Sequence, residues 1–126
     1  MDTIMPPQAE VATDETQNLI SADKVVGTAV YNRDAERLGS VYGLMLNKLN
    51  GRVAYAIMSF GGFLGLGESY HPLPWSMLTY DTTLGGYVVD LDRRRLEKAP
   101  RYSAADEIDW GTYGGQIDNY YLMPLA

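Results

Sequence analysis

The sequence predicts a mainly β domain, a small antiparallel barrel or sandwich of about six short strands. Segments rich in β-branched and aromatic residues alternate with turn signals roughly every ten residues. The pair Asn50-Gly51 favours a tight hairpin, because glycine readily adopts positive φ. Glycines inside the expected strands, at Gly39 and Gly43, mark the bulges or bends that a small barrel needs in order to close. Little of the chain has helical spacing.

The expected strands run, in chain order, over 24–31, 38–47, about nine residues from 53, 68–73, 79–82 and 86–91. Pro74 should end the fourth strand, since proline lacks the N–H that a central strand donates, and a single helical or 3₁₀ turn should follow at Trp75. Asp92 is a good N-cap for a short helix over 93–98. Leu91 and Leu96 then occupy the positions of a hydrophobic staple.

With 126 residues, the chain suits one domain with two tails. Residues 1–18 are polar and acidic without periodicity, which predicts a disordered leader. Residues 19–100 should form the domain. Residues 101–126 hold more aromatic side chains than a disordered tail would, so we expect this extension to pack on the domain or on a second subunit. The GTYGGQ stretch suggests an extended path with one turn rather than a long helix.

Composition limits the classes of function. No apolar run is long enough to cross a bilayer, and no basic segment followed by an apolar one marks a signal peptide, so we expect a cytoplasmic protein. Without cysteine there is neither a disulfide nor a thiolate metal site. The net charge of −6 lies mainly in the two tails, which argues against nucleic-acid binding. The basic run Arg93–Arg95 is interpreted as a solvated first helical turn in preference to a phosphate site.

The stretch from Val53 to Leu78 organises the rest of the chain. Its two strands are joined by GGFLGLG, an apolar glycine-rich loop that cannot bury its own side chains. The rest of the domain or a partner must cover them. Aromatic residues of the tail are of the types enriched at binding hot spots. The candidate partner-binding residues are Phe63, Leu64, Leu66, Trp75, Trp110, Tyr113, Tyr120 and Tyr121. Whether the tail seals the loop within one chain or meets another polypeptide stays open.

Catalytic signals are weak. His71 is the single histidine and has no neighbours at ligand spacing, which favours a structural role. Glu68 and Asp81 could pair, but carboxylates are common at strand ends. The glycines of the loop lack the order, and the following helix, of a dinucleotide-binding loop. We therefore expect no catalytic residue, metal or cofactor. A six-stranded barrel would also be filled by its own side chains.

Taken together, these segments resemble the PRC-barrel family. The resemblance covers about residues 19–100 and rests on LGSVYGLMLN, the Asn-Gly turn, VAYAIMSFGGFLGLGESYHPLPWSML and YVVDLDRRRLEKAP. Its most specific part is the loop from Gly61 to Glu68 followed by a strand and Pro74-Trp75. The resemblance implies a compact six-stranded β-barrel that acts by docking to other proteins. No transmembrane helix and no second domain precede the barrel, so we expect a stand-alone bacterial member.

Two functions follow as expectations. The favoured one is a non-enzymatic interaction or assembly module that docks another protein through the apolar loop and the aromatic tail, as a homodimer. The alternative is a small-molecule or cofactor-binding protein whose site lies at a subunit interface, lined by tyrosines and His71.

Overall fold

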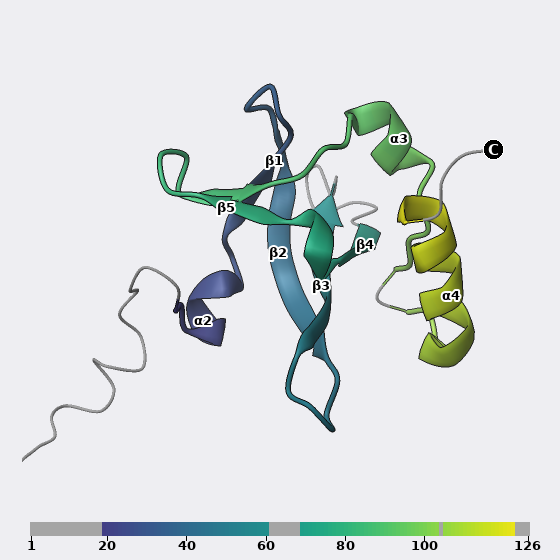
Figure 1. Cartoon of the computed structure of the whole chain (residues 1–126). Coiled ribbons are helices and arrows are strands. Elements are labelled where there is room, and N and C mark those ends of the chain that lie inside the picture. Colours follow the sequence, from purple (N-terminus) through teal and green to yellow (C-terminus); the bar gives the residue numbers. More distant parts are fainter. Residues whose placement is uncertain (1–18, 61–68, 104, 123–126) are drawn as a thin grey trace, which may run out of the picture.

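The computed structural model describes residues 19–60, 69–103 and 105–122. The predicted leader and the glycine-rich loop therefore lie outside the described residues. The described part is mainly β, as predicted, with few helices (Figure 1). Its strands are β1 (Ala29–Tyr31), β2 (Arg37–Leu46), β3 (Val53–Phe60), β4 (Ser69–Pro74), β5 (Thr79–Asp81) and β6 (Gly86–Val88).

All six strands belong to one sheet in the order β4-β3-β2-β1-β6-β5. The predicted antiparallel barrel is wrong in two respects. The sheet is mixed, because β1 and β6 pair in parallel, as a long connection between two strands permits. It is also not closed, because β4 and β5 remain its two edges. The C-terminal segment occupies the β4 edge, where Tyr102 pairs with Tyr70 in an antiparallel bridge.

The first strand is shorter than predicted because a helical turn precedes it. Helix α2 covers Ala22–Val25, and the Ser21 hydroxyl accepts a hydrogen bond from the Asp23 amide at its start. Gly27, with φ of +92°, then turns the chain into β1. The β-branched pair Val25-Val26 favours a strand by itself, but the Ser21 cap and Gly27 favour a helical turn here.

The β2–β3 pair forms the long central hairpin of the sheet (Figure 1). At Gly39 a Cβ atom would come within 2.1 Å of the Ser59 carbonyl oxygen, so only glycine allows these strands to approach. The predicted bulge lies at Tyr42, since Val41 faces Met58 and the next paired residue, Gly43, faces Ile57. Gly51 at the hairpin turn has φ of +77°, which confirms the predicted positive φ.

The segments after β4 follow the prediction closely. A 3₁₀ turn, η2 (Trp75–Met77), comes directly after Pro74. Strands β5 and β6 form the predicted hairpin, although β6 ends at Val88. Helix α3 covers Arg93–Glu97, and the Asp92 carboxylate caps it by accepting from the Arg95 amide at 2.7 Å.

The predicted extended tail is wrong, because residues Trp110–Tyr121 form helix α4. The Asp109 carboxylate caps it by accepting from the Gly111 amide. Its buried residues, Gly114, Ile117 and Tyr121, recur at helical spacing and form one face. The glycine-rich sequence suggested a turn, but burial of this face against the sheet outweighs the poor helix propensity of glycine.

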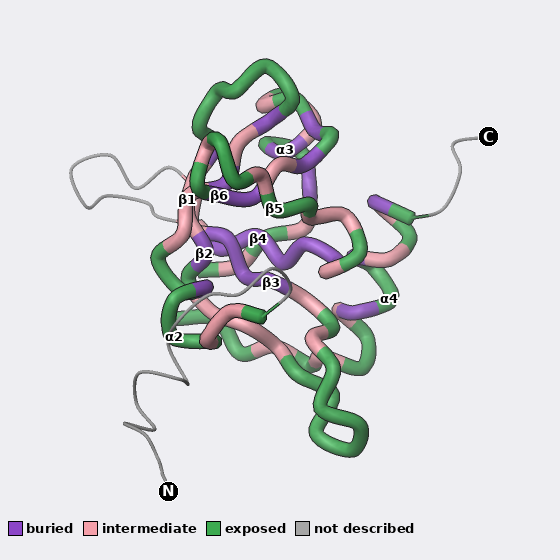
Figure 2. Tube along the Cα trace, turned by 60° about the vertical axis from the view of Figure 1, so that its left-hand side comes forward, coloured by how far each residue is buried: buried purple, intermediate pink, exposed green. Residues whose placement is uncertain are grey.

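A single apolar core joins the sheet, α3 and α4, and the burial map shows it as a band through the centre (Figure 2). Ala56, Ile57 and Met58 are consecutive and all buried, so the middle of β3 is covered on both faces. Leu91 and Leu96, the expected staple residues, both belong to this core. None of the helices in the described ranges has the length and apolar character needed to cross a membrane.

Candidate interaction surface

The C-terminal segment covers the β4 edge of the sheet. Tyr70 and Tyr102 exchange two backbone hydrogen bonds, of 2.9 and 3.0 Å, which extend the ladder by one bridge. Helix α4 packs beside β4 (Figure 1). The Tyr55 hydroxyl on β3 donates to the Asp118 carboxylate at 3.1 Å and lies 3.3 Å from the Gly114 carbonyl oxygen. Thus β4 is buried from Tyr70 onward although it is an edge strand.

A continuous group of rings crosses this covered edge. We call it the aromatic strip and define it as Tyr42, Tyr70, Tyr102, Trp110 and Tyr113. Successive ring centroids lie 4.5 Å apart for Tyr42 and Tyr70, 5.5 Å for Tyr70 and Tyr102, and 6.2 Å for Tyr102 and Trp110. Tyr113 contacts both Tyr102 and Trp110, at 6.1 and 5.5 Å. Three separate parts of the chain thus contribute to one apolar surface.

The bulge in β2 explains how the strip begins. Tyr42 is the extra residue of the bulge, and its side chain is 57% exposed. Because β3 lies between β2 and β4, the Tyr42 and Tyr70 rings meet across β3. The strip therefore passes from an exposed ring at Tyr42 to half-buried rings on α4. A bulge re-aims a side chain in this way without ending the strand.

Burial perturbs the phenols of the strip. Desolvation raises the pKa of Tyr113 to about 12, helped by the nearby Tyr102 and Asp106. Desolvation also raises the pKa of Tyr102. The Tyr113 hydroxyl is buried and has no hydrogen-bond partner among the described residues. These phenols stay neutral at physiological pH and behave as apolar surface with a polar tip.

The structure separates the other predicted residues from the strip. Tyr120 and Tyr121 pack on Arg95, whose guanidinium carbon lies 5.3 and 5.8 Å from their ring centroids. The Tyr120 hydroxyl donates to the Arg95 carbonyl at 2.6 Å, and Arg95 Nη2 donates to the Tyr120 carbonyl at 2.8 Å. This reciprocal pair ties α3 to α4. Trp75 packs instead on Tyr87, with centroids 5.5 Å apart.

The remaining predicted docking residues, Phe63, Leu64 and Leu66, lie outside the described residues, as does Glu68. Of the predicted set, the structure places Trp110 and Tyr113 in the strip, whereas Tyr120 and Tyr121 contact each other beside Arg95. Sequence reasoning missed Tyr42, Tyr70 and Tyr102. The bulge glycine was a usable signal for Tyr42, whereas Tyr102 became relevant only once the chain returned to β4.

The basic run of α3 makes tertiary contacts and is not merely solvated. Arg93 pairs with the Glu36 carboxylate at 2.9 Å, donates to the Arg37 carbonyl at 3.1 Å, and lies over the Phe60 ring at 5.4 Å. Arg95 holds α4 as described above. Two of the three arginines therefore join α3 to the sheet and to the tail, which leaves Arg94 as the exposed member.

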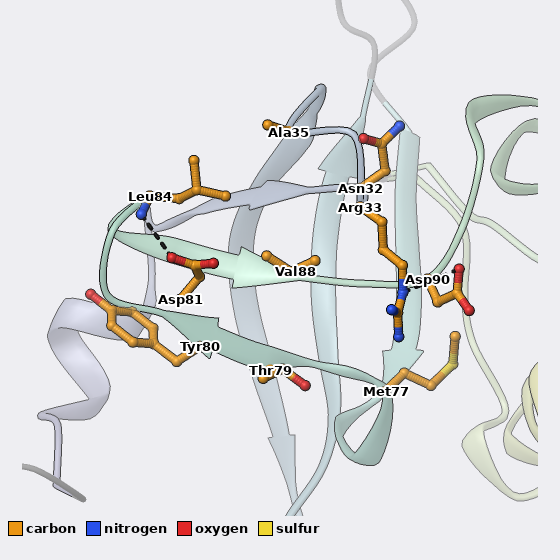
Figure 3. Close-up of a pocket in the computed structure, with 10 residues that line it drawn as sticks. All are labelled: Asn32, Arg33, Ala35, Met77, Thr79, Tyr80, Asp81, Leu84, Val88 and Asp90. Atoms are coloured by element: carbon orange, nitrogen blue, oxygen red, sulfur yellow. Dashed lines mark hydrogen bonds and ion pairs between the residues drawn. The ribbon is translucent and has the colours of Figure 1, made fainter.

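A pocket of about 380 Å³ lies between the β1–β2 turn and the β5–β6 hairpin (Figure 3). Its polar groups already have partners. Arg33 lies 3.5 Å from the Asp90 carboxylate. Asp81 accepts from the Thr83 and Leu84 amides and so caps its own turn. Asn32 bonds Glu36 and the backbone of its loop. The pocket thus offers no converging group that resembles a catalytic constellation.

His71 is fully buried on β4. Its Nε2 lies 3.3 Å from the Ser69 hydroxyl, and its ring packs edge-on against Phe60 at 5.4 Å. Burial lowers the pKa of His71 to about 4, and the positive charge of Arg101 adds to this effect. The imidazole is neutral and shielded in this conformation. In the described ranges, no group of three or more histidine and acidic side chains could hold a metal ion.

The family to which the chain belongs is shown by its sequence. The model of the PRC-barrel domain matches residues 17–96. The chain belongs to the PRC-barrel domain family. This confirms the resemblance based on the sequence. No curated protein matches the chain. The match ends within α3, so the aromatic strip combines family strands (Tyr42, Tyr70) with residues beyond the matched region.

Proposed function

We propose that this PRC-barrel protein is a non-enzymatic interaction module of the bacterial cytoplasm, and that it docks a second copy of itself through the aromatic strip. One observation carries the proposal: five rings in contact extend from a 57% exposed tyrosine on β2 to α4. Tyrosine and tryptophan dominate binding hot spots, because each covers a large area at low entropic cost.

Two further features support docking over catalysis. In the pocket beside β5, Arg33 faces Asp90, and the Asp81 carboxylate accepts from the backbone amides of its own turn. His71, the one imidazole, is buried inside the sheet, so it offers no surface to a substrate in this conformation. The predicted apolar loop, Gly61 to Gly67, joins β3 to β4, and the aromatic strip includes Tyr70 of β4, which suggests that both act on one partner.

The test is the solution mass of the full chain by light scattering over micromolar concentrations. We expect a dimer whose dissociation constant rises at least tenfold in the Tyr42→Ser variant, because the exposed end of the strip is lost (about 1.4 kcal/mol or more). Leu49→Ser is the matched control, since Leu49 is 92% exposed at the tip of the β2–β3 hairpin and outside the strip.

A Phe63→Ser, Leu64→Ser double variant tests the loop separately. Weakened self-association with an unchanged circular dichroism spectrum supports its role. A full-length chain that stays monomeric at 100-fold higher concentration, or a dimer insensitive to Tyr42→Ser, contradicts docking through the aromatic strip.

A further inference from the structure

A second hollow lies between α4 and the segment that follows α3. It has a volume of about 560 Å³ and is lined by Lys98, Ala99, Pro100, Arg101, Tyr113, Gln116, Asn119 and Tyr120. We call it the α4 cleft. Its size is within the range of small-molecule sites. It is separate from the pocket of Figure 3, with which it shares none of these residues.

The charge of the α4 cleft differs from that of the whole chain. The chain carries a net charge of −6, with 10 basic against 16 acidic side chains. The described lining of the cleft nevertheless contains two cations, Lys98 and Arg101, and no carboxylate. Such a local excess of positive charge attracts anions even when the total charge is negative.

Neither cation is neutralised within the chain as described. The ion pairs of the described ranges join Arg33 to Asp90 and Arg93 to Glu36. Nη1 of Arg101 donates to the Glu97 carbonyl at 2.8 Å, which positions the guanidinium and leaves its other donors available. Lys98 is the C-cap residue of α3, and its ammonium group forms no ion pair with a described residue.

Two carboxylates on the same segments of the chain have partners of their own. Asp118 on α4 accepts from the Tyr55 hydroxyl at 3.1 Å. Asp106 accepts from the Ser103 amide at 2.9 Å. Gln116 and Asn119 lie on the exposed side of α4 and add amide donors to the same wall. The donor groups of the cleft therefore come from two segments of the chain, and no carboxylate of the described residues lines it.

The remaining walls are apolar. Pro100 and the rings of Tyr113 and Tyr120 are half-buried and line the cleft. Tyr120 is held in place by its hydroxyl bond to the Arg95 carbonyl at 2.6 Å. A rigid ring wall beside two cations favours a ligand with an apolar body and an anionic end.

We propose that the α4 cleft binds a small organic anion, in which a carboxylate or phosphate group meets Lys98 and Arg101 and a compact apolar body packs against Tyr113 and Tyr120. The ordinary alternative, two solvated lysine and arginine side chains on a shallow surface, predicts no saturable binding. The proposal does not depend on self-association through the aromatic strip.

The test is an NMR titration of the full chain with phenyl phosphate, inorganic phosphate and benzylammonium at constant ionic strength. We expect saturable shifts of the Gln116 and Asn119 side-chain amides and of the backbone amides of Lys98, Ala99 and Arg101. Phenyl phosphate should bind more tightly than inorganic phosphate, which lacks the apolar body. Benzylammonium should not bind, because it carries the opposite charge.

Variants identify the site. Lys98→Gln with Arg101→Gln should weaken phenyl phosphate binding at least tenfold, and Lys98→Gln alone should weaken it less while leaving the Arg101 bond to Glu97 intact. Arg52→Gln, at the distant exposed hairpin, is the matched control and should bind like the parent. An absence of saturable shifts, shifts that the double variant leaves unchanged, or equal binding of benzylammonium overturns the proposal.

Discussion

The two edges of the sheet are treated in opposite ways. The β4 edge spans Ser69–Pro74 and is covered by the Tyr102 bridge and by α4. The β5 edge spans only Thr79–Asp81, its first two residues are exposed, and within the described part it pairs with β6 alone. A long apolar edge invites pairing with other chains, whereas a very short one presents few free groups. The C-terminal segment thus covers the β4 edge, which is the longer and more apolar of the two.

The comparison also explains why the sheet stays open. In a closed barrel, β4 and β5 would pair with each other. Here the backbone groups of Tyr70 bond Tyr102 instead. The three following experiments remove or probe the cover of the β4 edge, and the first and third use the β5–β6 hairpin as the reference.

The largest effect is expected from Ile117→Ala. Ile117 is fully buried on the inner face of α4, so its truncation removes packing and leaves a cavity. We expect this to lower the free energy of unfolding by about 2–5 kcal/mol. Urea unfolding followed by tryptophan fluorescence measures it. Leu84→Ala, in the β5–β6 turn, is the reference and should cost clearly less, because Leu84 is only half-buried. Equal costs at the two positions would mean that α4 contributes no more than a surface loop.

The second experiment uses pH, because His71 lies on the covered strand with a pKa of about 4, lowered by burial and by Arg101. The unfolded chain binds this proton near pH 6.5, so between pH 6.5 and 4 the unfolded state holds more protons. Stability should therefore fall as the pH drops through this window. The difference between the two pKa values makes the titration of His71 lower the free energy of unfolding by about 3 kcal/mol at pH 4 and below. This destabilisation is absent above pH 7.

Urea unfolding at a series of pH values measures this contribution as the difference between the parent and His71→Gln. The shape of the difference matters rather than its absolute size, because the substitution also changes packing. Carboxylates titrate in both proteins and cancel. A difference that does not vary between pH 7 and 4 would show that His71 titrates as an exposed histidine does.

The smallest effect is expected from removing one tyrosine hydroxyl near each edge of the sheet. Tyr120→Phe removes the 2.6 Å bond to the Arg95 carbonyl that ties α4 to α3, and should lower the free energy of unfolding by about 1 kcal/mol. Tyr80→Phe on the β5 edge should change it by less than about 0.5 kcal/mol, because Tyr80 is an exposed surface residue. Thermal unfolding of both variants gives the comparison. A larger loss for Tyr80→Phe would reverse the assignment of covered and open edges.

Local chemistry made much of the fold predictable. The Asn-Gly turn, the 3₁₀ turn after Pro74 and the Asp92 cap each depend on neighbours in the sequence, and each is confirmed. The predicted strand from residue 24 begins too early, because the β-branched pair Val25-Val26 was weighed without the Ser21 cap that favours a helical turn at 22–25. The predicted extended tail was wrong, because the glycines were weighed without the packing that Ile117 gains in a helix over 110–121.

The candidate surface was less predictable than the strands. Trp110 and Tyr113 were expected for their residue type, but their neighbours Tyr70 and Tyr102 are 32 residues apart in sequence and meet only through an isolated bridge. The α4 cleft likewise depends on where the last segment returns, and the sheet order depends on the parallel pairing of β1 with β6. The sequence by itself determined the strands, turns and caps, because these follow from short-range sterics and hydrogen bonding. Tertiary structure decided the open mixed sheet, the aromatic strip and the cleft, because each joins residues that only long-range burial brings together.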